Sequence, residues 1–392
     1  MKKLSVLILA SILAFTSCTK DDSTDSSPAV PLKRVEVNGT VSTNTIWTAD
    51  NVYIVTGSIT IGNNATLTIE PGTSVKFNSN MEIDVASSGF GTIKALGTAE
   101  KPILFTSNAT NKTKGDWFGF WLYEGSNGCE FAYCTFEYGA GYSETQGVMN
   151  LRSDVEASFD HCTFKNNNGY GIQLNSSASF SSFNYNNFSD NTNKGVDIYA
   201  NYVSTMGINN TYDSEILVEG DHVVENGDVN WKNQGTTLLV NDDIEVGSTS
   251  GTKLIIEAGI RLAFMKNAEL GVAYASNTTG LIVANGTTEK PIVFTSASNY
   301  PGKGDWDGIW FYTNTANGNS FDHCVIEYGG GYSDDGNFIF KSGVSEKVSI
   351  SNSIIRYSKG YGLYKSSGSD NTVPVLTNIT YTDNTLGDKN WQ

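Results

Sequence analysis

Basic residues, histidines and long apolar segments are all scarce in this chain of 392 residues. It carries 25 lysines and arginines against 41 acidic residues, only three histidines, and a net charge of −16. Because so acidic a chain repels polyanions, a nucleic-acid-binding role is unfavourable. Beyond the N-terminal segment, no stretch has an apolar 3.6-residue period long enough for a sizeable helix. A mainly helical protein is therefore not expected.

Glycine and aromatic residues are abundant instead, and large parts of the sequence occur twice. The chain has 40 Gly, 19 Tyr and 19 Phe, with many Asn, Ser and Thr, which is an all-β composition. The copies are offset by nearly the same number of residues throughout, which predicts two halves with the same architecture, residues 35–221 and 222–392. The matching pairs of segments are 97–107 and 286–296, 114–117 and 303–306, and 137–143 and 327–333.

A shorter period recurs inside each half. Similar triplets follow one another at spacings of 24 to 29 residues, separated by Gly and Asn turns. A parallel β-solenoid requires such spacing, because each coil must bring its strands back above themselves. We expect about thirteen coils in one continuous solenoid. The triplets are 134–136, 162–164 and 186–188, then 324–326, 353–355 and 378–380.

The N-terminus has the form of an export signal. Two lysines precede an apolar run that is too short to span a bilayer permanently, and Cys18 follows it. This pattern resembles a bacterial lipoprotein signal, which implies a signal peptide at 1–17 and lipidation of Cys18; the alternative is an ordinary secreted protein cut near residue 17. Residues 20–22 resemble the surface-export signal of Bacteroidetes lipoproteins, or else form a polar tether. Residues 18–34 predict a disordered spacer.

Several motifs identify a family resemblance. The segment 66–77, the repeated Gly-Thr-x-Glu-Lys-Pro-Ile runs, the Gly-Asp-Trp sites and the Glu-Tyr-Gly segments are similar to bacterial surface proteins with a right-handed parallel β-helix, within the pectate-lyase-like superfamily. The resemblance implies the fold over most of residues 36–392. It leaves the function open, because this fold hosts lyases, hydrolases, esterases and non-catalytic adhesins.

Aromatic residues at alternate positions predict a ligand site in each half. Strand alternation places Phe118, Phe120 and Leu122 inside and the intervening rings outside, beside a cation from the next coil. Such a row suits the apolar face of a sugar ring. The alternative is that these rings pack under the loops 107–116 and 296–305. The predicted sites are Trp117, Trp121, Tyr123 and Arg152 in the first half, and Trp306, Trp310, Tyr312 and Lys341 in the second.

Two glutamates are candidates for acid–base catalysis, since paired carboxylates flank the scissile bond in glycosidases. The coil register offers a structural interpretation, because it places Lys165 over Glu137 and Arg356 over Glu327. Such cross-strand pairs contribute roughly 0.2–1 kcal/mol on a surface. We therefore interpret both glutamates as structural.

The histidines and cysteines give no clear chemical site. Asp-His-Cys occurs at 160–162 and 322–324, but other coils have Tyr or Asn at the histidine position, which indicates a polar turn. Cys134 and Cys162 fall on neighbouring coils, so a disulfide and two free thiols both remain open. The acidic residues that calcium-dependent lyases need are not shared between the halves, because Phe118 stands where the second half has Asp307. No metal and no cofactor is expected.

Together these patterns predict a surface-exposed outer-membrane lipoprotein that is a non-catalytic glycan-binding or adhesion module. Its partners would be a glycan or another polymer of a host or cell surface, and the membrane through the lipid. A β-helix polysaccharide lyase or hydrolase and a surface spacer without ligand are the alternatives. Clustered carboxylates in a cleft would favour the enzyme, and an exposed aromatic row without them would favour binding.

Overall fold

Stacked parallel strands are the main regular structure of the protein in a computed structural model, which describes residues 32–333, 335–366 and 372–392. The predicted signal peptide, Cys18 and the tether up to residue 31 lie outside the described residues. The helices within the described part are short 3-10 turns, and none of them is long and apolar enough to cross a membrane. They are η1 (Glu124–Ser126), η2 (Ala200–Thr205) and η3 (Ser345–Lys347).

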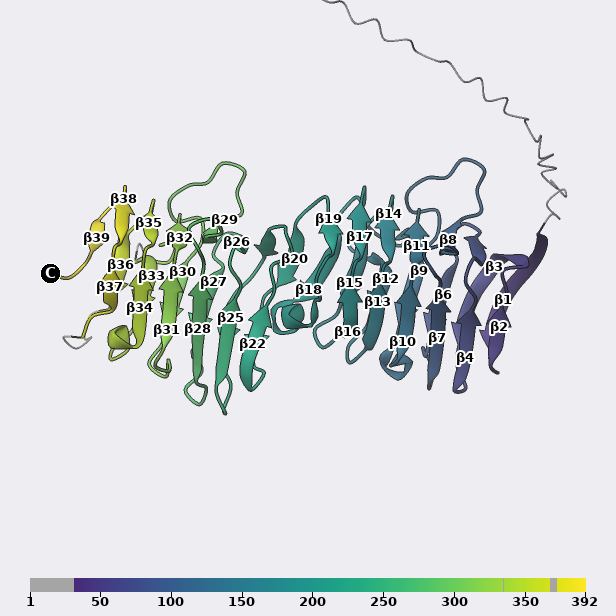
Figure 1. The fold of residues 1–392 in the computed structure, drawn as a ribbon, viewed down its shortest axis with the longest axis horizontal. Helices are drawn as coiled ribbons and strands as arrows, with labels where there is room; N and C mark the ends of the chain where they lie inside the picture. Colours follow the sequence, from purple (N-terminus) through teal and green to yellow (C-terminus); the bar gives the residue numbers. More distant parts are fainter. Residues whose placement is uncertain (1–31, 334, 367–371) are drawn as a thin grey trace, which may run out of the picture. The chain divides into compact units, whose positions relative to one another are not determined.

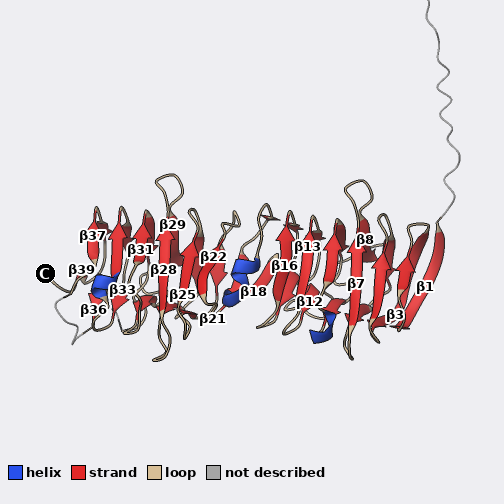
Figure 2. Cartoon of the chain, turned by 60° about the horizontal axis from the view of Figure 1, so that its bottom comes forward, coloured by secondary structure: helices blue, strands red, loops and turns tan. Residues whose placement is uncertain are grey.

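The unit that begins at Lys33 is a right-handed parallel β-helix of about thirteen turns, which confirms the predicted fold class. Each coil contributes up to three strands, and Figure 1 shows the strands of successive coils side by side. Figure 2 shows that helix is confined to a few short turns. Every side chain that points inward therefore packs on the equivalent side chains of the coils before and after it.

In the first half the strands form three faces. One face is a separate sheet of β2 (Thr45–Trp47), β4 (Ala65–Ile69), β7 (Gly91–Leu96), β10 (Cys129–Ala132), β13 (Glu156–Asp160) and β16 (Ser179–Asn184). The second face contains β5 (Ser74–Phe77), β8 (Ile103–Ser107), β11 (Cys134–Glu137), β14 (Thr163–Lys165), β17 (Asn187–Ser189) and β19 (Thr211–Tyr212). The third contains β6 (Glu82–Val85), β9 (Gly119–Leu122), β12 (Gly147–Leu151), β15 (Tyr170–Leu174), β18 (Val196–Tyr199) and β20 (Ile216–Glu219). The long strand β3 (Asn51–Ile61) pairs with β1 (Lys33–Val41), β5 and β6.

The second half repeats this plan. Its first face is β22 (Gly227–Trp231), β25 (Thr252–Ile256), β28 (Gly280–Asn285), β31 (Asn319–Asp322), β34 (Val348–Ser351) and β37 (Val375–Thr377). Its second face is β23 (Leu238–Val240), β26 (Arg261–Phe264), β29 (Ile292–Ser296), β32 (Cys324–Glu327), β35 (Ile354–Arg356) and β38 (Thr380–Thr382). Its third face is β21 (Asp221–Val223), β24 (Ile244–Val246), β27 (Glu269–Val272), β30 (Gly308–Phe311), β33 (Gly336–Phe340), β36 (Tyr361–Lys365) and β39 (Gly387–Lys389).

The ladders change partners where the halves join. Strand β20 continues the third face of the first half through β18, yet on its other side it pairs with β23 of the second face. The third face of the second half starts anew at β21, and η2 contacts β16, β18, β21 and β22 at this junction. At the junction, the third face of the first half is therefore continued by the second face of the second half, and the third face of the second half is a separate sheet.

Inward side chains form continuous columns. Phe105, Phe136, Phe164 and Phe188 stack along successive coils with ring centroids 4.9, 4.8 and 5.0 Å apart, and all are at most 1% exposed. The spacing matches the separation of neighbouring strands, so identical residues at one coil position stack face to face. Phe136, Phe164 and Phe188 are the last residues of three repeated triplets, so these triplets mark one coil position that points inward.

Candidate functional site

Trp117 and Trp306 lie in the core, so the expectation that they face outward is wrong. Both side chains have no exposed surface. Trp117 stacks on Phe77 at 3.9 Å between ring centroids, and its indole N–H donates to the Glu137 carbonyl at 2.9 Å. Trp306 stacks on Phe264 at 4.3 Å and donates in the same way to the Glu327 carbonyl at 2.8 Å. Neither ring is available to a ligand.

The error has one physical cause, a glycine at the start of each strand. β9 begins at Gly119 with φ +123°, and β30 begins at Gly308 with φ +103°, values that side chains rarely adopt. The residues before the glycine are therefore out of phase with the strand after it. Phe118, expected inside, instead lies half-exposed with its ring 5.6 Å from Tyr142.

After the glycine the alternation holds, and the remaining first-half residues do share one outer surface. Trp121 and Tyr123 are half-buried, while Arg152 from the next coil is exposed with its guanidinium 5.6 Å from the Trp121 ring centre. The ring of Tyr142 packs edge-on against Trp121, with ring centroids 6.1 Å apart. We call Trp121, Tyr123, Tyr142 and Arg152 the first aromatic cluster.

The second half builds the same arrangement more tightly. Trp310 and Tyr312 stack with ring centroids 5.9 Å apart and an angle of 18°, and the ammonium of Lys341 lies 4.5 Å from the Trp310 ring centre. Tyr332 packs edge-on against Trp310 at 5.6 Å. Trp310 is only 3% exposed, so it supports the other rings from beneath. These four residues are the second aromatic cluster.

Each aromatic cluster borders a hollow. The hollow of the first half has a volume of about 740 Å³ and is lined by Tyr123 and Arg152 together with the exposed ring of Phe90. The cleft of the second half has a volume of about 650 Å³, and all four members of the second aromatic cluster line it. Both volumes fall within the range of small-molecule sites.

The second-half cleft also contains a set of acidic side chains that the sequence analysis did not identify. Its lining includes five acidic residues from successive coils, and no ion pair involves any of them in the described part of the chain. They lie at the coil spacing, for example 24 residues apart at 245 and 269, which is the signal that could have identified them. The five are Asp221, Asp242, Asp243, Glu245 and Glu269.

The carboxylates of Glu245 and Glu269 interact with each other. The Glu245 carboxylate lies across Gly271, where a Cβ atom would come within 2.6 Å of it. Burial first, and then repulsion from Glu269, raises the pKa of Glu245. Burial likewise raises the pKa of Glu269, although the Tyr312 hydroxyl donates to Glu269 Oε1 at 2.9 Å and opposes the shift. Burial also raises the pKa of Asp307 to about 6.

These shifts predict a stability that falls as pH rises. A carboxyl whose pKa is higher in the folded protein binds more protons there than in the unfolded chain, so stability is lost between the unfolded pKa and the folded pKa. We expect the unfolding midpoint in urea to fall from pH 5 to pH 8, and to fall less in Glu245→Gln. A pH profile that is the same in parent and variant would contradict the assignment.

The glutamates considered for catalysis lie on the second face and are ion-paired as the register predicted. Glu137 pairs in the ladder with Lys165, whose ammonium lies 3.4 Å from Oε2, and accepts from the Thr106 hydroxyl at 2.8 Å. Glu327 accepts from both Nε and Nη2 of Arg356, at 2.7 and 2.6 Å. Both are more buried than a surface pair, at 9% and 6% exposure.

Removing these charges should affect stability and not binding. We expect Glu327→Gln to lower the free energy of unfolding by about 1.5–3 kcal/mol, because it weakens a two-point charged contact in a buried position. Glu137→Gln should cost about 1 kcal/mol, because its two lysine partners, Lys112 and Lys165, are partly exposed and their contacts are longer, at 3.4 Å each. Urea unfolding of both variants measures this difference. Loss of a polysaccharide-cleaving activity in a fully folded variant would instead make these residues catalytic.

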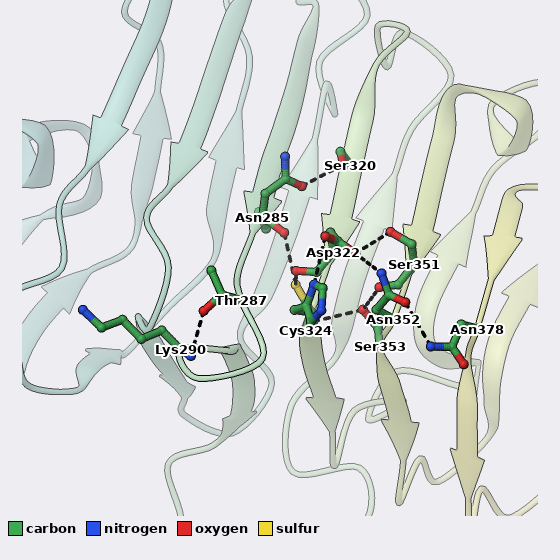
Figure 3. A network of polar contacts seen from close by, with 12 residues as sticks. Asn285, Thr287, Lys290, Ser320, Asp322, Cys324, Ser351, Asn352, Ser353 and Asn378 are labelled. Carbon is green, nitrogen blue, oxygen red and sulfur yellow. Dashed lines mark hydrogen bonds and ion pairs between the residues drawn. The ribbon is translucent and has the colours of Figure 1, made fainter.

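The Asp-His-Cys segment at 322–324 forms a structural corner, and Figure 3 shows the polar contacts of Asp322 and Cys324 there. Asp322 accepts from the Ser351 hydroxyl at 2.6 Å and from the Asn352 side chain at 2.9 Å, and lies 2.9 Å from His323 Nδ1. Cys324 points into the core at 1% exposure, and burial raises the pKa of its thiol. A buried, protonated thiol beside a hydrogen-bonded turn has no nucleophilic character.

The other cysteines of the described residues are buried free thiols, including Cys134 and Cys162 on adjacent coils. Burial and the neighbouring Cys162 raise the pKa of the Cys134 thiol. Among the described residues, no three or more His, Cys, Asp or Glu side chains are placed to hold one metal ion. The carboxylates of the second-half cleft therefore form no such group.

The duplicated β-helix agrees with the comparison to protein families. The model of the pectate-lyase like beta helix domain matches residues 39–128 and again residues 224–344, one segment in each half. The chain belongs to this family. No curated protein and no solved structure matches the chain. Trp121 and Tyr123 lie within the first matched segment of the family domain, and the whole second aromatic cluster lies within the other.

Proposed function

We propose that the protein is a non-catalytic glycan-binding module of the β-helix family. The observation that supports this most strongly is the second-half cleft, in which the stacked rings of Trp310 and Tyr312 lie beside the ammonium of Lys341. Rings accept the apolar face of a sugar, and charged side chains around them bind its hydroxyls. The first aromatic cluster offers a related surface.

The elongated repeat suits a polymeric ligand. Two binding surfaces on one solenoid can hold a repeating chain more strongly than either alone, because the second contact is intramolecular. The surfaces are not identical, since Asp84 of the first half occupies the ladder position of Gly271 and Thr60 that of Glu245. We therefore expect the second-half cleft to provide most of the affinity.

A glycan array tests the proposal directly. The purified protein should bind at least one class of polysaccharide, and Lys341→Ala should reduce the signal while Lys290→Ala, an exposed lysine outside the cleft, leaves it unchanged. Absence of binding to every glycan would leave the surface spacer as the better description.

Hydrolysis is a second candidate because one observation favours it. Glu245 and Glu269 have raised pKa values in the cleft, and the Glu245 Oε2 atom is buried without a hydrogen-bond partner in the described residues. One proton shared by this pair would satisfy that oxygen and leave an acid and a carboxylate side by side. Release of shorter products from a bound glycan, abolished by Glu269→Gln, would establish catalysis.

We further propose display on the outer face of the outer membrane through lipid on Cys18, supported by the sequence pattern at residues 2–22. Protease added to intact cells should remove the protein, whereas Cys18→Ser should release it from the membrane fraction. Protection until the outer membrane is opened would contradict surface display.

A further inference from the structure

The second-half cleft contains carboxylates that the fold does not pair with basic side chains. Five carboxylates line it against a single lysine, and the ammonium of Lys341 lies on the Trp310 ring and forms no ion pair with any of the five. Elsewhere in the described chain, carboxylates of the second face such as Glu137 and Glu327 have Lys or Arg partners. A positively charged ligand could therefore form the ion pairs that these carboxylates do not form within the protein.

The shape of the cleft limits what such a ligand can be. Its acids are distributed over several coils from β21 to β27, and they include no group of three that could hold one metal ion. A charge repeated along a chain fits this distribution better than one compact ion. The aromatic wall, with Trp310 stacked on Tyr312 and Tyr332 at its edge, adds flat surfaces for sugar rings and cation–π contacts for ammonium groups.

We infer that the second-half cleft binds a cationic, amine-bearing polysaccharide, whose sugar rings stack on Tyr312 and whose ammonium groups pair with the carboxylates of Asp243 and Glu269. This inference rests on the proposed glycan-binding function and specifies its ligand class. A polyuronate is disfavoured by the same charges, since each of its units would face an acidic wall.

Asp243 and Glu269 should provide the preference for a cationic over a neutral glycan, and each can be tested by a different substitution. Asp243 is exposed at the rim, where its Oδ1 accepts from the Glu269 backbone N–H at 2.9 Å, so Asp243→Asn removes charge with little change of shape. Glu269 lies deeper and accepts from the Tyr312 hydroxyl, so Glu269→Gln keeps an acceptor for that bond. Glu289→Gln, an exposed position outside the cleft, is the control for loss of one net charge.

Calorimetric titration of the whole protein with two oligosaccharides tests the inference. The probes are a β-1,4-glucosamine hexamer with protonated amines and the N-acetylglucosamine hexamer, which has the same backbone and no charge. We expect the glucosamine hexamer to bind at least about tenfold more tightly, a difference that the Asp243→Asn and Glu269→Gln double variant should largely abolish and that Glu289→Gln should leave intact. Added salt should weaken only the glucosamine complex.

Each other result overturns the inference. Equal or tighter binding of the N-acetylated hexamer would show a glycan site without charge selection. Binding of a different neutral or acidic glycan in place of both hexamers would assign another ligand class, and a need for added calcium would assign the carboxylates to a metal. In these three cases the proposed glycan-binding function stands, whereas failure of every glycan to bind would remove both.

Discussion

Replacement of Trp306 by Ala should lower the free energy of unfolding by about 3–5 kcal/mol, the largest effect that we expect from a single side chain. The ring is fully buried and stacked on Phe264, and the surrounding coils are too rigid to close over its volume. The indole N–H also ties the ring to the Glu327 carbonyl. Trp117→Ala should behave alike, because Trp117 makes the equivalent contacts with Phe77 and Glu137.

The matched control is Trp306→Phe, which keeps a ring against Phe264 but loses the indole hydrogen bond and part of the volume. We expect it to cost roughly half as much as the alanine variant, since a lost hydrogen bond contributes about 1 kcal/mol. Urea denaturation followed by circular dichroism measures both. A loss below about 1 kcal/mol in Trp306→Ala, together with loss of ligand binding, would return Trp306 to the binding surface.

Replacement of Tyr312 by Ala should have the largest effect on ligand affinity, a loss of about tenfold or more. Tyr312 combines three roles in the second-half cleft, because its ring stacks on Trp310, lines the hollow and directs a hydroxyl to Glu269. It is half-buried, so its removal disturbs the fold less than removal of Trp310 would. Titration of a binding oligosaccharide gives the two dissociation constants.

Tyr312→Phe separates the ring from the hydroxyl, and Tyr123→Ala serves as the control in the first half. We expect only a few-fold loss in the phenylalanine variant, because the stacking surface remains, and a smaller loss for Tyr123→Ala than for Tyr312→Ala. If Tyr312→Ala binds as tightly as the parent while its unfolding midpoint is unchanged, the aromatic wall plays no part in recognition.

The fold and its register could be predicted because a solenoid repeats one local solution. Residues at the same coil position stack on one another, so a spacing of 28 residues places Lys165 beside Glu137 and a spacing of 29 places Arg356 beside Glu327. Met149, Leu151, Phe338 and Phe340 face inward, as alternation within their strands predicts. These features depend only on strand spacing and periodicity.

The candidate site was only partly predictable, for two physical reasons. Strict alternation does not continue through Gly119 and Gly308, because their positive φ values reverse the sides of Trp117 and Trp306. The second reason is that the two halves differ at their acidic positions. Glu269 has an acidic counterpart in Glu82, but Glu245 has none, because the first half has Thr60 there, so the acidic pair of the cleft is not repeated between the halves.

A crystal structure of the protein with its best-binding oligosaccharide tests the central claim most directly. We predict sugar rings in the second-half cleft, stacked on Tyr312 and within hydrogen-bonding distance of Lys341 and Glu269. An oligosaccharide bound instead along the second face near Glu137 or Glu327, with the second-half cleft empty, would contradict the account.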